Sequence, residues 1–174
     1  MKIRWILTFI FTVALGSAMH FFYDWLPIPL VGLFAPINES VWEHLKLLFW
    51  PFLIGCIFLQ RTSKNRQAFW GAALAASLVM PLFLTGMYYL LNGGFMVESL
   101  PVDLALYALT MLLGFVLLSS WKDKLWAEKA LGILILVAGL YGACLILFSI
   151  AAPDFPIFTP PQGEKTAKIL GIYR

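Results

Sequence analysis

Five long runs of apolar residues follow one another along the chain, separated by short stretches that hold most of the polar side chains. The runs cover about residues 3–23, 40–59, 68–91, 102–121 and 130–152. Each run is long enough to cross the hydrocarbon core of a bilayer, which takes roughly 20 helical residues. The apolar residues are continuous rather than alternating, which favours helices over a membrane barrel. The pattern therefore predicts an all-α polytopic membrane bundle with about five transmembrane helices.

Helix breakers and charged residues mark the connections between these runs. Three connectors are polar or contain glycine: residues 61–66 (RTSKNR), 91–101 (LNGGFMVESLP) and 121–129 (WKDKLWAEK). The segment 26–38 (LPIPLVGLFAPIN) is apolar, but its prolines prevent a regular helix, so we expect a loop folded as a lid over the outer end of the bundle. Pro51 and Pro81 lie inside runs, where we expect them to kink the helices.

Composition agrees with a membrane protein of one domain. Of the 174 residues, 61% are hydrophobic and 12% are charged, and the mean hydropathy is +0.88. A soluble domain has about a quarter of its residues charged. The net charge of +3 comes from basic residues in short connectors, which gives no reason to expect a nucleic-acid partner. We therefore predict one transmembrane domain over residues 1–174, in the lipid bilayer of the cytoplasmic membrane; Cys56 and Cys144 lie within apolar runs and are interpreted as packing residues.

Lysine and arginine are distributed unevenly among the connectors. With the N-terminus inside, eight of them fall in cytoplasmic segments and three in outer segments, while Lys46 lies within the second run. The positive-inside rule then predicts the N-terminus in and the C-terminus out. Seven of the nine acids and both histidines fall on the outer side. We expect the proline-rich tail, residues 153–174, to lie along the same outer surface and to cover the polar groups there.

The start of the chain permits a second interpretation. Residues 1–18 (MKIRWILTFIFTVALGSA) have a basic beginning, an apolar stretch and the small residues Gly16 and Ala18, as a secretory signal does. The apolar run continues beyond this point through MHFFYDW, which favours an uncleaved helix. Cleavage would leave four spans and would place His20 almost at the new N-terminus.

Polar residues recur at the outer ends of several runs. His20 and Asp24 are four residues apart, so they share one face of the first helix. Asp103 and Tyr107 have the same spacing at the start of the fourth run. Tyr88 and Tyr89 lie at the outer end of the third run.

The second run opens with the polar sequence PINESVWEHLKL, residues 36–47. We expect Asn38 to be the N-cap of this helix, with Glu39 and Ser40 in its first turn. Ser40 and His44 then form one i,i+4 pair, and Glu39 and Glu43 form another. The first two helices are expected to be antiparallel neighbours, because the segment that joins them is short.

Two imidazoles and several carboxylates at one depth form a donor set that suits a divalent metal, with zinc the first choice and iron or manganese next. The candidate metal ligands are His20, Asp24, Glu43, His44 and Asp103. Glu39, Ser40 and Glu43 are the candidate catalytic residues, which would orient a water or a substrate. Ionisable residues inside a membrane are costly, which makes them functional candidates.

Each of these residues also has a structural interpretation. Glu39 at a helix N-terminus is explained by the helix dipole. Asp24 and Asp103 are explained as residues at the level of the lipid headgroups. Lys46 is expected either to extend toward the membrane surface or to pair with Glu43 at i,i+3.

Three stretches resemble a family of small multi-pass bacterial membrane proteins with no assigned activity: residues 20–25 (HFFYDW), 31–51 (VGLFAPINESVWEHLKLLFWP) and 158–161 (FTPP). The most specific part is NESVWEHLKL. The resemblance implies that the polar residues of these stretches belong to the family pattern: His20, Asn38, Glu39, Ser40, Glu43 and His44. It implies no activity.

A fainter similarity concerns Ser40-x-x-x-His44 after an acid at a helix start, which is similar to the Ser-x-x-x-His element of the alkaline ceramidase and adiponectin-receptor superfamily. Those proteins are seven-span zinc amide hydrolases. This chain has fewer spans and lacks the later His-x-x-x-His pair. A zinc site here would therefore need His20 and carboxylates in its place.

These features lead to three hypotheses. The first is a membrane-embedded, metal-dependent hydrolase acting on a lipid-like or amide substrate. The second is a small cation- or proton-coupled transporter, which the scarcity of polar residues in the inner half of the chain argues against. The third is a non-catalytic assembly or sensor subunit that docks a partner on its outer face. The sequence does not indicate an oligomeric state.

Overall fold

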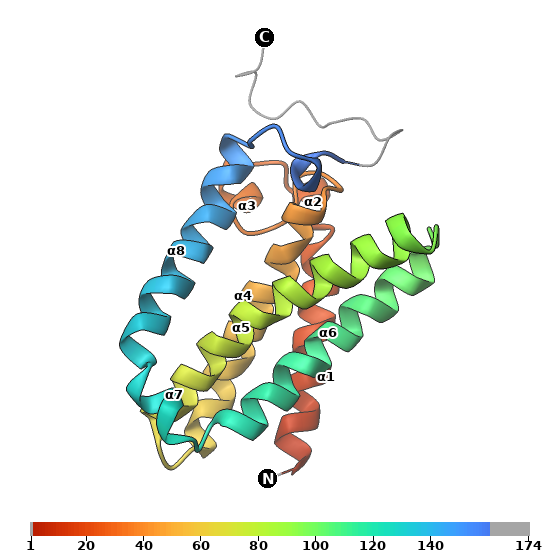
Figure 1. The fold of residues 1–174 in the computed structure, drawn as a ribbon. Coiled ribbons are helices and arrows are strands. Elements are labelled where there is room, and N and C mark those ends of the chain that lie inside the picture. Colours follow the sequence, from red (N-terminus) through yellow and green to blue (C-terminus); the bar gives the residue numbers. More distant parts are fainter. Residues whose placement is uncertain (1, 161–174) are drawn as a thin grey trace.

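The computed structural model describes residues 2–160, and the regular elements of this range are helices (Figure 1). Five of them are long: α1 (Lys2–Met19), α4 (Val41–Leu59), α5 (Arg66–Tyr89), α6 (Leu100–Trp121) and α8 (Leu131–Ile150). The shorter ones are α2 (Phe22–Trp25), α3 (Pro29–Gly32), α7 (Leu125–Lys129), the 3₁₀ turns η1 (Gln60–Thr62) and η3 (Pro156–Phe158), and the π-helical turn η2 (Leu90–Gly94).

Four helices are long and apolar enough to cross a membrane: α4, α5 with its continuation η2, α6 and α8. Within residues 2–160 this confirms the predicted all-helical architecture, with helices that are apolar enough to span a membrane. The apolar part of α1, Ile3–Met19, is shorter. The first predicted run, 3–23, is too long as a single helix, because the chain turns at residues 20–21 and continues as α2. The other predicted runs agree with the observed helices to within two residues at each end.

Helix α5 lies at the centre of the bundle and contacts α4, α6, α7 and α8, while α1 packs on α4 and α6. Small side chains let these helices approach closely. Ala72, Ala73 and Ala76 on α5 have no exposed surface. At Gly71 a Cβ atom would lie 1.9 Å from the carbonyl oxygen of Ala127, so α5 and α7 meet there backbone to backbone.

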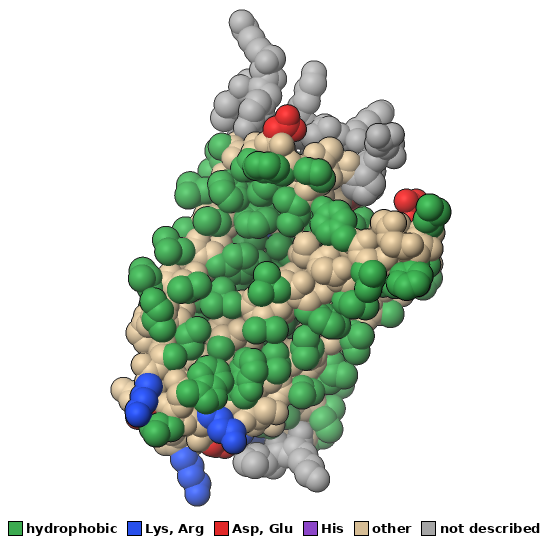
Figure 2. All heavy atoms as spheres, in the orientation of Figure 1, with side chains coloured by type: hydrophobic (Ala, Val, Ile, Leu, Met, Phe, Trp, Pro, Cys, Tyr) green, Lys and Arg blue, Asp and Glu red, His purple; other side chains and the backbone are tan. Residues whose placement is uncertain are grey.

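The outer surface of the long helices is apolar, as expected for side chains that face lipid. Only 17% of the apolar stretch of α8 is buried inside the protein. Figure 2 shows hydrophobic side chains over most of the visible face, with lysine and arginine gathered at the end that carries α7. We call this the α7 end; the opposite end, formed by residues 20–40, is called the loop end.

The segment between α2 and α4 folds back onto α4 and is held there by a buried lysine. Lys46 has no exposed side-chain surface, and its Nζ donates to the carbonyl oxygens of Gly32 at 2.8 Å and Ala35 at 3.3 Å. It also pairs with Glu43 Oε2 at 2.7 Å. Of the two interpretations of Lys46, the i,i+3 pair with Glu43 is therefore confirmed.

Glu43 completes this network from the other side. Its Oε2 accepts a hydrogen bond from the backbone N–H of Ile37 at 3.1 Å. Its Oε1 accepts one from Ser149 Oγ of α8 at 2.8 Å. A buried ion pair is costly unless its remaining hydrogen-bonding capacity is used, and here both partners are fully engaged. The network joins the loop end to α4 and α8.

The predicted position of the C-terminal tail can be compared with the structure only up to residue 160. Within this part, Phe158 of η3 packs against Trp42 of α4 with ring centroids 4.9 Å apart. The predicted cover over the polar groups concerns mainly residues 161–174, which lie outside the described residues.

Candidate metal centre

Helix α4 begins two residues later than the sequence predicts. Ser40, not Asn38, is its N-cap: the Ser40 side chain accepts a hydrogen bond from the N–H of Glu43 at 3.4 Å. Asn38 instead accepts one from the N–H of Ser40 through its side-chain oxygen, at 2.8 Å, which forms an Asx turn before the helix. Glu39 therefore precedes the helix, and the expected i,i+4 relation between Glu39 and Glu43 is wrong.

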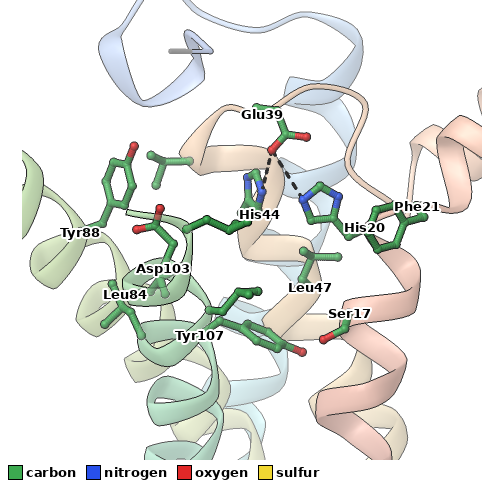
Figure 3. A pocket seen from close by; sticks show the side chains of 14 residues that line it. Ser17, His20, Phe21, Glu39, His44, Leu47, Leu84, Tyr88, Asp103 and Tyr107 are labelled. Carbon is green, nitrogen blue, oxygen red and sulfur yellow. Dashed lines mark ion pairs between the residues drawn. The ribbon is translucent and has the colours of Figure 1, made fainter. Parts of the chain in front are cut away.

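Because Glu39 lies before the helix, its carboxylate points toward both histidines (Figure 3). Its Oε2 lies 3.2 Å from His44 Nε2 and 3.6 Å from His20 Nε2. The two imidazole rings lie 5.1 Å apart, centroid to centroid, at an angle of 77°. The side chains are about one-third exposed, 31% for His20, 37% for Glu39 and 29% for His44. Residues from the turn after α1, from α4 and from the loop before α4 thus meet at one point.

The hydrogen bonds of His44 restrict where its protons lie. Nδ1 lies 2.9 Å from the carbonyl oxygen of Ser40, which can only accept, so Nδ1 carries a hydrogen. Nε2 faces the Glu39 carboxylate, also an acceptor. In a neutral ring with its hydrogen on Nδ1, the lone pair of Nε2 would face a lone pair of the Glu39 carboxylate, which is repulsive. The contact needs either a proton on Nε2 or a cation that binds both atoms.

His20 is oriented mainly by ring packing. Its imidazole stacks on Phe21 with centroids 5.1 Å apart. Its Nδ1 is buried and has no hydrogen-bond partner among the described residues. A backbone carbonyl fixes the ring of His44, as is common for metal-binding histidines. His20 has no such partner among the described residues.

The three side chains form a group that could hold one metal ion. One ligand atom from each of His20, Glu39 and His44 can be chosen so that all three lie within 4.8 Å of one another. Ligands bound tetrahedrally at roughly 2.0–2.1 Å from zinc are about 3.3 Å apart. The separations of 3.2 and 3.6 Å are close to this value. Three protein ligands with a fourth position open are typical of catalytic rather than structural zinc sites.

Electrostatics keep the carboxylate of this group ionised. The pKa of Glu39 is lowered from its ordinary value of 4.5, chiefly by the hydrogen bond with His44 and further by the charges of the two imidazoles, whereas partial burial opposes the shift. Glu39 is thus available as an anionic ligand at neutral pH.

The group lies at the edge of a cavity of about 500 Å³. Polar groups surround the part of the cavity near the loop end, and apolar side chains form the deeper part (Figure 3). The lining residues come from α1 and the turn after it, from the loop before α4, and from α4, α5 and α6: Ser17, His20, Phe21, Glu39, Val41, His44, Leu47, Leu84, Tyr88, Leu100, Asp103, Leu104, Leu106 and Tyr107. The arrangement combines a candidate metal position with space for an amphiphilic molecule.

The structure places the other predicted site residues apart from this group. Glu43 is 2% exposed and points to Lys46 and Ser149. Ser40 is the buried N-cap. Asp24 lies exposed on α2, outside the three-residue group. Asp103 lines the cavity on α6, also outside that group.

Sequence comparison places the chain in a known family. Residues 1–166 match a family described as a family of unknown function (DUF6512). The chain belongs to this family. The expected membership in an uncharacterised family is confirmed, and the match carries no activity with it. No curated protein and no solved structure matches the DUF6512 chain significantly.

The sequence indicates both histidines and Glu43 as candidate metal ligands and Glu39 as a candidate catalytic residue; these roles stay predictions, and the structure shows that Glu39, not Glu43, lies beside the histidines. The signal that separates them is the Ser40 cap, because a serine three residues before Glu43 is as good an N-cap as Asn38. Ser149 was missed altogether. It is a lone serine in an apolar run, and only the packing of α8 against α4 brings it to Glu43.

Proposed function

We propose that this DUF6512 protein is a membrane-embedded, metal-dependent hydrolase that acts on a lipid-like or amide substrate. The observation that carries the proposal is the convergence of His20, Glu39 and His44 at the edge of a largely apolar cavity. Zinc is the preferred ion, because two imidazoles and one carboxylate are a common catalytic zinc set. A metal with an open position lowers the pKa of bound water toward neutrality and so supplies a nucleophile.

The protein's own residues have distinct tasks in this proposal. His20, Glu39 and His44 hold the ion. Ser40 fixes the His44 ring through its backbone carbonyl and begins α4 so that Glu39 stays outside the helix. Asp103, across the cavity on α6, is available to a polar group of the substrate.

The same geometry favours a hydrolase over a transporter. Beneath the candidate metal position the cavity is lined by Leu47, Leu84 and Tyr107. Lys46, the buried lysine of α4, is bound to the loop end rather than placed along a path. A cation moving through the bundle would have to pass two leucines and an aromatic ring and would meet no charged side chain there.

The proposed topology has five spans, with α1 as the first, the N-terminus in the cytoplasm and the loop end outside. It is supported by the gathering of lysine and arginine at the α7 end. The candidate metal centre would then act at the outer leaflet of the cytoplasmic membrane.

Elemental analysis of protein purified in detergent without chelators tests the proposal. We expect close to one zinc, iron or manganese ion per chain, and its loss in His20→Ala and His44→Ala variants that remain folded. Metal-loaded protein is then assayed against ester and amide lipids, with the His44→Ala variant as the blank. Wild-type protein without metal, or variants with unchanged metal content, would contradict the proposal.

A further inference from the structure

The wall of the cavity is interrupted between α1 and α6. Phe21, in the turn after α1, and Leu100 and Leu104 on α6 line the cavity and are also exposed large apolar side chains, at 49%, 70% and 55%. Ser17, one turn below Phe21, is exposed and lines the cavity as well. A residue that both lines a cavity and is exposed stands at its opening. The opening is therefore bordered by the outward faces of two apolar helices.

Closer to the α7 end, α1 and α6 meet and close this opening. A Cβ atom at Gly16 would lie 2.0 Å from Tyr107 Oη, so the two helices touch here. Tyr107 Oη also donates to the carbonyl oxygen of Val13 at 3.3 Å. The opening thus lies between this contact and the loop end, at the level of the candidate metal position.

We infer that the opening between α1 and α6 admits one hydrocarbon chain of a membrane lipid directly from the bilayer. This inference rests on the proposed function as far as catalysis is concerned. It adds the substrate class, which is a long-chain acyl amide or ester. The carbonyl group lies by His20, Glu39 and His44, and the hydrocarbon chain runs past Leu104 into the membrane.

Three observations favour this ligand over a water-soluble one. If the substrate arrived from solution, the apolar side chains at the opening would have to face water, and exposing apolar surface to water is energetically unfavourable. The cavity volume of about 500 Å³ is in the range that holds one small molecule or one chain. The carboxylate of Asp103 lines the cavity and makes no hydrogen bond among the described residues, so an N–H or O–H near the lipid carbonyl would give it a partner.

Photolabelling in lipid nanodiscs tests the inference without measuring catalysis. The probe is a long-chain N-acyl amine with a diazirine in its chain, and the labelled peptides are identified by mass spectrometry. We expect labels on the peptides that contain Phe21 and Leu104, and competition by the unlabelled long-chain amide but not by its acetyl counterpart. The experiment is run on metal-stripped protein as well, because the apolar wall binds the chain without metal.

A matched pair of variants makes the test specific. Leu104→Trp fills the opening, and Leu109→Trp adds the same ring at a 52% exposed position of α6 that does not line the cavity. We expect Leu104→Trp to reduce labelling at the opening about tenfold and Leu109→Trp to leave it unchanged. Ser17→Phe, which narrows the opening from α1, serves as the second variant if Leu104→Trp unfolds.

The outcomes separate this inference from the proposed hydrolase. Labelling spread evenly over the exposed faces of α6 and α8, or equal labelling of wild type, Leu104→Trp and Ser17→Phe, overturns the lipid opening even if metal is bound. Specific labelling of a protein that never binds metal upholds the opening and removes the hydrolase.

Discussion

Glu39 occupies the position immediately before the N-cap of α4, which lets its carboxylate reach one histidine in the turn after α1 and another on α4. We expect Glu39→Gln to lower metal affinity by at least the roughly 10- to 100-fold that loss of an outer-shell partner costs. Isothermal titration with zinc measures this change. Asp24→Asn is the matched control, because it removes the same charge from an exposed residue of α2. An equal loss of affinity in the control would show that Asp24, too, belongs to the centre.

Acidification should release the metal before it unfolds the protein. The pKa of Glu39 is lower in the folded protein than its ordinary value of 4.5, so the charged carboxylate stabilises the fold. This stabilisation is complete above about pH 4.5 and is lost as the pH falls through the lower pKa of the folded state. Imidazoles have ordinary pKa values of about 6.5 and bind metal only when neutral. Metal content after dialysis should therefore fall between about pH 7 and 5, while the thermal transition persists. Retention of metal until the protein unfolds would contradict His20 and His44 as ligands.

The sequence predicted which kinds of residue gather at the candidate metal centre, but not which of them contact one another. Spacing along the chain indicated that polar groups gather at one end, and both histidines were found in this way. Which of Glu39 and Glu43 lies beside the histidines could not be read from spacing, since it depends on which residue caps α4. The pattern fits a cap at Asn38 as well as one at Ser40, and the choice decides whether Glu39 lies in the first turn of the helix or before it.

At the level of elements, the contact between the loop end and α4 depends on Lys46. Lys46→Met leaves Glu43 buried without a counter-charge, which should destabilise the protein by about 3–5 kcal/mol. In the double variant Lys46→Met/Glu43→Gln the loss should be smaller, because no buried charge remains and the new amide side chain still offers an oxygen to the N–H of Ile37. Reversible unfolding in mixed micelles measures these differences.

The matched control for this prediction is Lys122→Met. Lys122 pairs with Asp123 at the surface, so its replacement should cost no more than about 1 kcal/mol. If Lys46→Met were as mild as Lys122→Met, the buried network would not be what holds the segment before α4 in place.

Helix α5 and helix α7 approach too closely for any side chain at Gly71. In Gly71→Ala the new Cβ would overlap the Ala127 carbonyl, and we expect a loss of about 1–3 kcal/mol. Gly139→Ala on α8 meets nothing within 4 Å and should be neutral or stabilising by up to about 1 kcal/mol. Metal content should be unchanged in both variants, since the contact lies at the α7 end. Thermal unfolding and elemental analysis together check this, and a stable Gly71→Ala would refute the close contact.

The elements themselves were largely predictable, since a long apolar run has little choice but to form a helix in lipid. The error in the first run has a local cause. His20 and Phe21 continue the apolar pattern but form a turn, and composition does not distinguish a turn inside an apolar run from a further helical turn. The opening of the cavity between α1 and α6 was not predictable, because it depends on where Gly16 and Tyr107 bring these two helices together.

On the scale of the whole molecule, the proposed orientation rests on an asymmetry between the two ends. Lysine and arginine gather at the α7 end, and the candidate metal centre lies at the loop end. Single cysteines in a background without Cys56 and Cys144 test this in intact cells with a membrane-impermeant maleimide. We expect Gly93→Cys to be labelled directly, and Arg4→Cys and Lys124→Cys only after permeabilisation, because five spans place both on the cytoplasmic side. Direct labelling of Arg4→Cys with Lys124→Cys still protected would show that α1 does not cross the membrane. Direct labelling of both, with Gly93→Cys protected, would invert the protein and move the metal centre to the cytoplasmic leaflet.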